Sequence, residues 1–243
     1  MARPGQTNRF RSATGLIISA LFVIALVVTY FLYRGYSSST ARSMRVLTWL
    51  REPQTHQDWI VQAVSRCGEA PFLIPSSGFI GYLWRDSFRA GHHHQGIDIF
   101  GGTDGNITPV YAAYPGYLIR LLEWKSSLII RIPDDPLHPG RQIWTYYTHM
   151  ASQEGVSYIV QDFPPGAYEV YVEAGTLLGY QGNFSGTPGV PTGVHLHFSI
   201  VFDDGRGSFR NELEVENTLD PSPYFGLMLN ADANRDTIPI CEP

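Results

Sequence analysis

The sequence predicts an all-β fold, either a sandwich or a barrel. From Pro71 onward, short runs of β-branched and aromatic residues alternate with Gly, Pro, Asn and Asp, which is typical of strands joined by turns. The 24 glycines and 17 prolines suit a turn-rich chain, and a hydrophobic content of 44% in 243 residues is enough for one domain with a real core. The net charge of −5 shows no basic excess of the kind that indicates nucleic-acid binding.

An apolar segment precedes this region. Residues Leu16–Tyr33 contain no charged residue, and their number is about the minimum needed to cross a bilayer. Arginines precede the run, and no acidic residue occurs before Glu52, which favours a cytoplasmic N-terminus. We therefore expect residues 1–35 to form a short cytoplasmic terminus and a single-pass transmembrane helix, with the rest of the chain outside. A cleaved signal peptide is the alternative.

Residues 36–70 are expected to be a linker followed by a short helix. The polar residues Ser37–Thr40 begin the linker. Thr55 is followed three residues later by Asp58, a spacing that resembles a capping box. The pattern predicts a short amphipathic helix over residues 56–66 that packs on the domain.

Seven segments have the composition of strands. They are residues 96–100, 109–113, 116–123, 127–132, 142–149, 168–172 and 195–202. Pro109 cannot donate a hydrogen bond to a neighbouring strand, so it fits the first residue of a strand or an edge. No internal repeat or low-complexity tract is present.

The chain has two cysteines, Cys67 and Cys241, at the two ends of the domain expected outside the cytoplasm. In that environment a pair of thiols tends to oxidise. A disulfide that closes so long a loop would add about 4–5 kcal/mol in the chain-entropy model. We expect the two to be bridged, with two unpaired thiols as the alternative.

A pair of histidines lies in the last predicted strand. His195 and His197 are two residues apart, so their side chains share one face of a strand, and Leu196 and Phe198 share the other. Alone, such a pair is most often two ordinary strand histidines. About a hundred residues earlier, the segment His94–Asp98 supplies another imidazole and a carboxylate. Two imidazoles and one carboxylate are the ligand set of a catalytic zinc site that leaves a fourth position for water.

The residues around His94 predict a loop that enters a strand. Gly96 is a poor helix former, so a helical pairing of His94 with Asp98 is disfavoured. If the backbone turns at Gly96, both side chains can converge on one ion. The neighbouring His92 and His93 are expected at the rim or in solvent.

Two further features have less specific patterns. His149 ends an aromatic strand, where a histidine is usually a surface residue. The glycine-rich segment 179–193 has no lysine of the phosphate-loop kind, so it is expected either to wall a substrate groove or to be a plain surface turn.

Together these motifs resemble the lysostaphin-type (LytM-like) zinc endopeptidases. The resemblance covers roughly residues 71–202 and rests on motifs in the family's order. These are residues 88–99 with 108–113, residues 146–150 with Met150 in place of Leu, residues 175–182, and residues 193–198.

The resemblance implies a mostly antiparallel β sandwich with the site in a groove. It implies that His94, Asp98 and His197 bind one zinc ion, and that His149 and His195 are the catalytic pair. The implied substrate is a peptide bond in the stem peptides or cross-bridges of bacterial peptidoglycan. The expected partners are therefore peptidoglycan peptides and, through the N-terminal helix, the membrane.

Two segments depart from the family pattern. Residues 151–174 form a long insertion, expected either as a hairpin over the groove or as a loop on a remote edge. Residues 203–243 continue past the last motif and are expected to form a C-terminal strap without chemistry of its own.

Two alternatives to a cell-wall enzyme stay open. A catalytically silent domain of this type could bind or activate another hydrolase, although such domains commonly lack metal-site residues and none is missing here. An endopeptidase that cleaves a protein is not excluded by the motifs.

Overall fold

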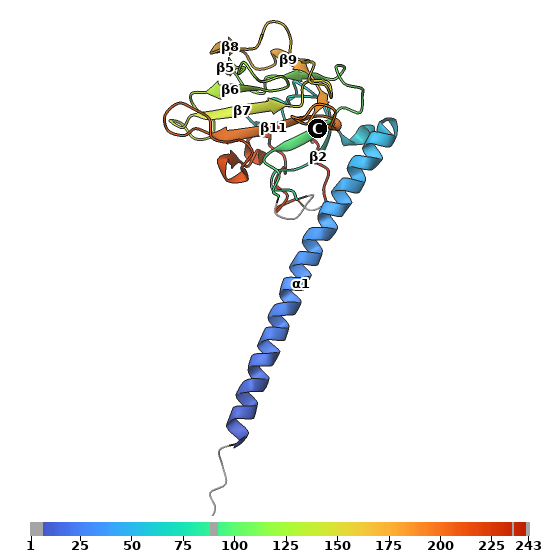
Figure 1. Cartoon of the computed structure of the whole chain (residues 1–243), viewed down its shortest axis with the longest axis vertical. Helices are drawn as coiled ribbons and strands as arrows, with labels where there is room; N and C mark the ends of the chain where they lie inside the picture. The colour runs from blue at the N-terminus through green and yellow to red at the C-terminus, as the bar shows by residue number, and fades with distance from the viewer. Residues whose placement is uncertain (1–6, 88–91, 235, 242–243) are drawn as a thin grey trace, which may run out of the picture. The chain divides into compact units, whose positions relative to one another are not determined.

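The chain forms two compact units, Met1–Ala41 and Arg42–Pro243. The computed structural model describes residues 7–87, 92–234 and 236–241, but not the side chains of residues 7–15 and 31–40. The predicted motif residues 88–91 therefore lie outside the described part. The second unit contains the β-sheets (Figure 1), and the residues of the candidate site also belong to it.

The N-terminal helix α1 runs from Thr7 to Arg51 without a break. It includes Ser37–Thr40, which we had expected to begin a linker. Within the described residues, no helix is both long and apolar enough to cross a membrane, so the predicted transmembrane helix over Leu16–Tyr33 is not supported. The last three residues of that predicted span lie where side chains are not described.

The predicted helix over residues 56–66 is wrong. The chain instead makes two single 3-10 turns, Pro53–Thr55 and Gln57–Trp59, and then strand β1, Ile60–Val61. Ile60 and Trp59 pack against a cluster of buried apolar side chains that includes Phe79. Strand β1 also pairs with β2 at the sheet edge, so backbone pairing and burial override the local helix signal.

The described residues of the domain form two sheets, and all pairs between named strands are antiparallel. The main sheet has the order β1-β2-β3-β11-β7-β6-β5-β8, with β10 and β12 also paired to β11, and β4 pairs with β9 in a small second sheet (Figure 1). The strands after β1 are β2 Gly78–Tyr82, β3 Ile97–Phe100, β4 Pro109–Tyr111, β5 Gly116–Ile119, β6 Leu128–Ile132, β7 Ile143–Thr148, β8 Val170–Val172, β9 Leu177–Tyr180, β10 Gly182–Phe184, β11 Pro191–Phe202 and β12 Thr218–Leu219. The mostly antiparallel β fold is confirmed, and every segment predicted as a strand contains one.

One face of the main sheet packs against the second sheet. Ile99 of β3 and Leu196 of β11 lie in the same buried cluster as Val110 of β4 and Leu178 of β9. Side chains alternate along a strand, so the next residues of β3 and β11 point to the opposite face. That opposite face carries the candidate site.

The described part of the segment that follows β11, from residue 203 onward, contains three short elements. They are a 3-10 turn Val215–Asn217, strand β12 and a short helix α2, Ser222–Phe225. Cys241 is bonded to Cys67, so the expected disulfide is confirmed. The bond ties the end of the chain to the segment that precedes the predicted peptidase region.

We predict that Cys241→Ser lowers the free energy of unfolding by about 2–5 kcal/mol, because the bond restricts a long loop in the unfolded chain. Denaturant unfolding of the full chain measures the loss. Cys67→Ser and the double variant should lose the same amount, since all three remove one bond. A loss below about 0.5 kcal/mol would contradict a stabilising role for the bridge.

Candidate metal centre

The pairing of β3 with β11 brings the two distant motifs together. Asp98 lies directly opposite His197 in the register, and Thr148 of β7 lies opposite His197 on the other side. Gly96 permits the close approach of the two segments, because a Cβ added there would lie 2.0 Å from the backbone oxygen of Phe198. The turn expected at Gly96 thus places Asp98 in the row of side chains that faces the groove.

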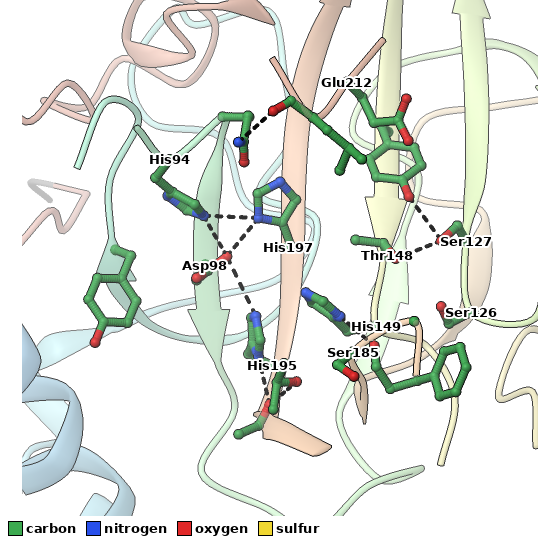
Figure 2. A pocket seen from close by; sticks show the side chains of 18 of the residues that line it. His94, Asp98, Ser126, Ser127, Thr148, His149, Ser185, His195, His197 and Glu212 are labelled. Carbon is green, nitrogen blue, oxygen red and sulfur yellow. Dashed lines mark hydrogen bonds and ion pairs between the residues drawn. The ribbon is translucent and has the colours of Figure 1, made fainter. Parts of the chain in front are cut away.

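Three donor atoms converge on this face (Figure 2). The Nε2 atom of His94 lies 3.0 Å from Asp98 Oδ1 and 3.0 Å from His197 Nδ1, and His197 Nδ1 lies 2.9 Å from Asp98 Oδ1. All three side chains are buried. The structure therefore brings together the three predicted ligand residues.

The chemistry of this donor set fits zinc. Lone pairs and a carboxylate so close together repel one another unless a proton or a metal cation lies between them. Donors about 2.0–2.2 Å from a tetrahedral zinc would be about 3.3–3.6 Å apart, so the observed separations of 2.9–3.0 Å would widen by roughly 0.3–0.7 Å around an ion. Two imidazoles and a carboxylate also favour zinc over calcium or magnesium, which prefer oxygen ligands.

The orientation of His94 is set by the backbone. Its Nδ1 lies 2.9 Å from the carbonyl oxygen of Leu83, to which it donates a hydrogen bond. The proton on Nδ1 leaves the lone pair of Nε2 directed at Asp98 and His197. A second hydrogen bond of this kind fixes the tautomer and the ring orientation of a metal-binding histidine.

His149 and His195 lie beside the donor cluster (Figure 2). Their ring centroids are 4.5 Å apart. Nδ1 of His149 donates to the carbonyl of Phe184 at 2.7 Å, and Nδ1 of His195 donates to the carbonyl of Gly193 at 2.7 Å. In both rings Nε2 is thereby the nitrogen that can act as a base.

The backbone at His149 is unusual. Its φ of 71° is left-handed, a conformation uncommon outside glycine although histidine is among the residues that adopt it more often. The strand β7 ends one residue earlier, at Thr148. The sharp change of direction turns the imidazole from the end of the strand to the carbonyl of Phe184. The local pattern alone favoured a surface residue, whereas the family resemblance implied a role at the site, and the side chain lines the groove.

Burial and neighbouring charges shift the pKa values of the ionisable side chains in the cluster. Burial lowers the pKa of His195 to about 4 and also lowers the pKa of His149, so both rings are neutral at pH 7. Burial opposes ionisation of Asp98, but the neighbouring imidazoles, His94 foremost, hold its pKa well below the usual range. Asp98 in turn raises the pKa of His94 against the effect of burial, so the negative charge lies beside an imidazole that favours its protonated form and beside the neutral rings of His149 and His195.

A groove of about 910 Å³ contains these five residues. Residues of the glycine-rich segment line it, some in the loop before β11 and some at the start of β11, so of the two alternatives the structure favours the groove wall. They are Ser185, Gly186, Pro188, Thr192 and Gly193. Among the described residues, none of the insertion 151–174 lines the groove; its strand β8 pairs with β5 at the far edge of the sheet, as the remote-edge alternative predicted.

Sequence reasoning missed part of the groove lining. Glu212 and Leu213 line the groove, so the segment expected to be a plain C-terminal strap contributes to the site. Val46 and Leu50 of α1 also line it. An apolar pair four residues apart on a helix indicates a packed face, but nothing local indicates which surface that face meets.

No protein-family profile and no curated protein sequence matches the chain. Among solved structures, lysostaphin from Staphylococcus simulans is similar, with a TM-score of 0.40, 22% identity, and coverage of 61% of this chain and 49% of that one. Its catalytic domain alone has a TM-score of 0.38 at 22% identity, with 61% of this chain and 90% of that one covered. The catalytic domain of the prophage-encoded M23 protein EnpA from Enterococcus faecalis has a TM-score of 0.37 at 20% identity, with 61% and 95% covered.

This chain thus spans about half the length of the lysostaphin structure. It is similar in structure to lysostaphin-type peptidases. The roles of the site residues rest on the motifs and on the geometry of the cluster.

We predict that His197→Ala weakens zinc binding by at least about 100-fold, because it removes one of three proposed ligands, whereas His195→Ala retains the ion. Zinc content after dialysis against a weak chelator distinguishes the two. A normal zinc content in the His197→Ala protein would overturn the ligand assignment.

We also predict that Gly96→Ala weakens zinc binding by about tenfold or more, because the new methyl group pushes β3 away from the Phe198 carbonyl and separates Asp98 from His197. The matched control is Gly193→Ala, where an added Cβ makes only ordinary contacts of 3.7 and 3.8 Å. Equal zinc affinity in the two variants would show that the close approach at Gly96 does not govern the site.

Proposed function

We propose that this protein is a zinc-dependent endopeptidase that hydrolyses peptide bonds in the stem peptides or cross-bridges of bacterial peptidoglycan. In this proposal His94, Asp98 and His197 hold one zinc ion, and His149 and His195 are the catalytic pair. The observation that carries the proposal is the convergence of three buried donors beside two neutral imidazoles in one groove.

When bound, zinc supplies Lewis acidity, which makes hydroxide available near neutral pH and polarises a substrate carbonyl. The proton transfers are assigned to two side chains of the protein, His149 and His195. His149 and His195 are neutral at pH 7, and each is held by a hydrogen bond from Nδ1 to a backbone carbonyl. Each Nε2 can therefore accept a proton from the attacking water and release it to the leaving amine.

Asp98 also acts on His195. Its Oδ1 lies 3.6 Å from His195 Nε2, close enough for its charge to stabilise an imidazolium after proton uptake. A protonated histidine at this position would be a donor toward the oxyanion of the tetrahedral intermediate. Burial of the carboxylate strengthens this effect because water screens it less.

One observation favours an enzyme over a silent binding domain, and another indicates the compartment in which the protein acts. All five proposed site residues are present and lie together, which favours an enzyme over a silent binding domain. The disulfide Cys67–Cys241 is typical of an oxidising compartment outside the cytoplasm, where peptidoglycan also lies. We therefore propose an extracytoplasmic site of action.

We expect the purified, zinc-loaded full chain to release peptide fragments from purified peptidoglycan. The fragments and their new ends are identified by mass spectrometry. His195→Ala should reduce the rate by about 100-fold or more while keeping its zinc, and chelation should abolish release until zinc is restored.

Release of the same fragments by chelated protein or by His195→Ala would argue against this mechanism. A folded, zinc-loaded chain that releases nothing would instead favour a protein substrate or a regulatory role toward another hydrolase.

A further inference from the structure

The last turns of α1 belong to the domain that contains the groove. Arg42–Arg51 lies in the second compact unit, although it precedes the region that resembles the endopeptidases. The Arg42 guanidinium pairs with Asp86 at 2.9 Å, and both side chains are buried. Arg42 also donates to the backbone carbonyl of Asn234. Because separating a buried ion pair leaves an uncompensated charge, these contacts fix the start of the segment.

The same helical segment is held against β2 and β3. Trp49 Nε1 donates to the backbone oxygen of Phe100 at 2.9 Å. Val46 packs directly on Gly81, where an added Cβ would lie 2.6 Å from Val46 Cγ2. The helix therefore sits in one position along the two strands.

Val46 and Leu50 form an apolar wall of the groove with Phe100. They are four residues apart and so lie on one face of the helix. A Cβ placed on Gly193 would be 3.8 Å from Leu50 Cδ1 and 3.7 Å from Phe100 Cε1, so the wall reaches the start of β11. The Phe100 ring stacks on the ring of His195 at 4.9 Å between centroids. The apolar wall thus begins at a proposed catalytic histidine.

The wall formed by Val46, Leu50 and Phe100 is entirely apolar. The three side chains have no hydrogen-bonding group, and Leu50 is 41% exposed, so apolar surface is left for a ligand to cover. Other parts of the groove lining carry polar groups, among them Ser127 and Glu212 (Figure 2). Contact with an aliphatic side chain would remove apolar area from water, whereas a glycine residue offers no side chain to this wall.

We infer that Val46 and Leu50, together with Phe100, form a specificity subsite that binds an aliphatic side chain of the substrate peptide next to the cleaved bond. The inference rests on the proposed function and narrows its substrate class: peptides with such a side chain beside the bond are preferred over glycyl–glycine bonds. Leu50 is the residue through which this preference can be tested, because it is the exposed part of the wall.

The kinetic test compares Leu50→Ser with Leu47→Ser in the full chain. Both leucines lie on the same helical segment and are similarly exposed, 41% and 43%, but Leu47 does not line the groove. The fragments released from peptidoglycan identify the cleaved bond, and peptides that span this bond are synthesised with Gly, Ala or Leu at each position beside it. At one position Leu50→Ser should lower the ratio of kcat/KM for the aliphatic peptide over the glycine peptide about tenfold.

Leu50→Met and Leu47→Ser should keep the wild-type ratio within about twofold, and zinc content should be the same in all variants. An unchanged ratio in Leu50→Ser would overturn the subsite. An equal change in Leu47→Ser would do the same, because it would show a general effect on the helix.

A binding measurement separates this inference from the proposed function. Methyl-labelled wild-type protein is titrated with trialanine and, separately, with triglycine, and the signals of Val46, Leu50 and Leu47 are followed by NMR. Shifts of Val46 and Leu50 with trialanine that exceed those with triglycine, without a shift of Leu47, support the subsite even if no peptidoglycan is cleaved. Absence of such shifts overturns the subsite even if cleavage occurs.

Discussion

The antiparallel pairing of β3 with β11 is the constraint on which the site depends. It sets Asp98 opposite His197, residues that lie far apart in the sequence. The pairing is held from the other face by Ile99 and Leu196, which are packed into the main core. A shift by one residue would turn the side chains of Asp98 and His197 into that core, so burial of the apolar face enforces the register of the candidate metal centre. The absence of a side chain at Gly96 is what allows this close approach.

Backbone carbonyls from three separate segments orient the histidines around that pair. The carbonyl of Leu83 follows β2, that of Phe184 ends β10, and that of Gly193 lies in β11. Each accepts a hydrogen bond from an Nδ1 atom, so each ring presents its Nε2 atom to the groove. The proton positions on these three rings are therefore set by main-chain geometry, and they depend on the fold as a whole rather than on the motifs alone.

The ends of the folded unit complete the groove around this centre. The C-terminal segment supplies Glu212 and Leu213 to the lining and, through Asn234, holds Arg42 of α1. The last turns of α1 then place apolar side chains beside Phe100. The disulfide further ties the C-terminal segment to Cys67. The parts of the chain outside the recognisable motifs thus line the groove beside the candidate site.

The sequence by itself predicted seven of the twelve strands of the described residues, because alternation of polar and apolar residues is a local property, and its motifs named the candidate site residues. It predicted that His195 and His197 share a face, and it left open whether the glycine-rich segment walls a groove or is a surface turn. Only the tertiary structure decided how Asp98 meets His197, that residues 56–66 are not a helix, and that Leu50 and Glu212 reach the groove. Those outcomes depend on packing between segments distant in sequence, and no local pattern specifies which surfaces will meet.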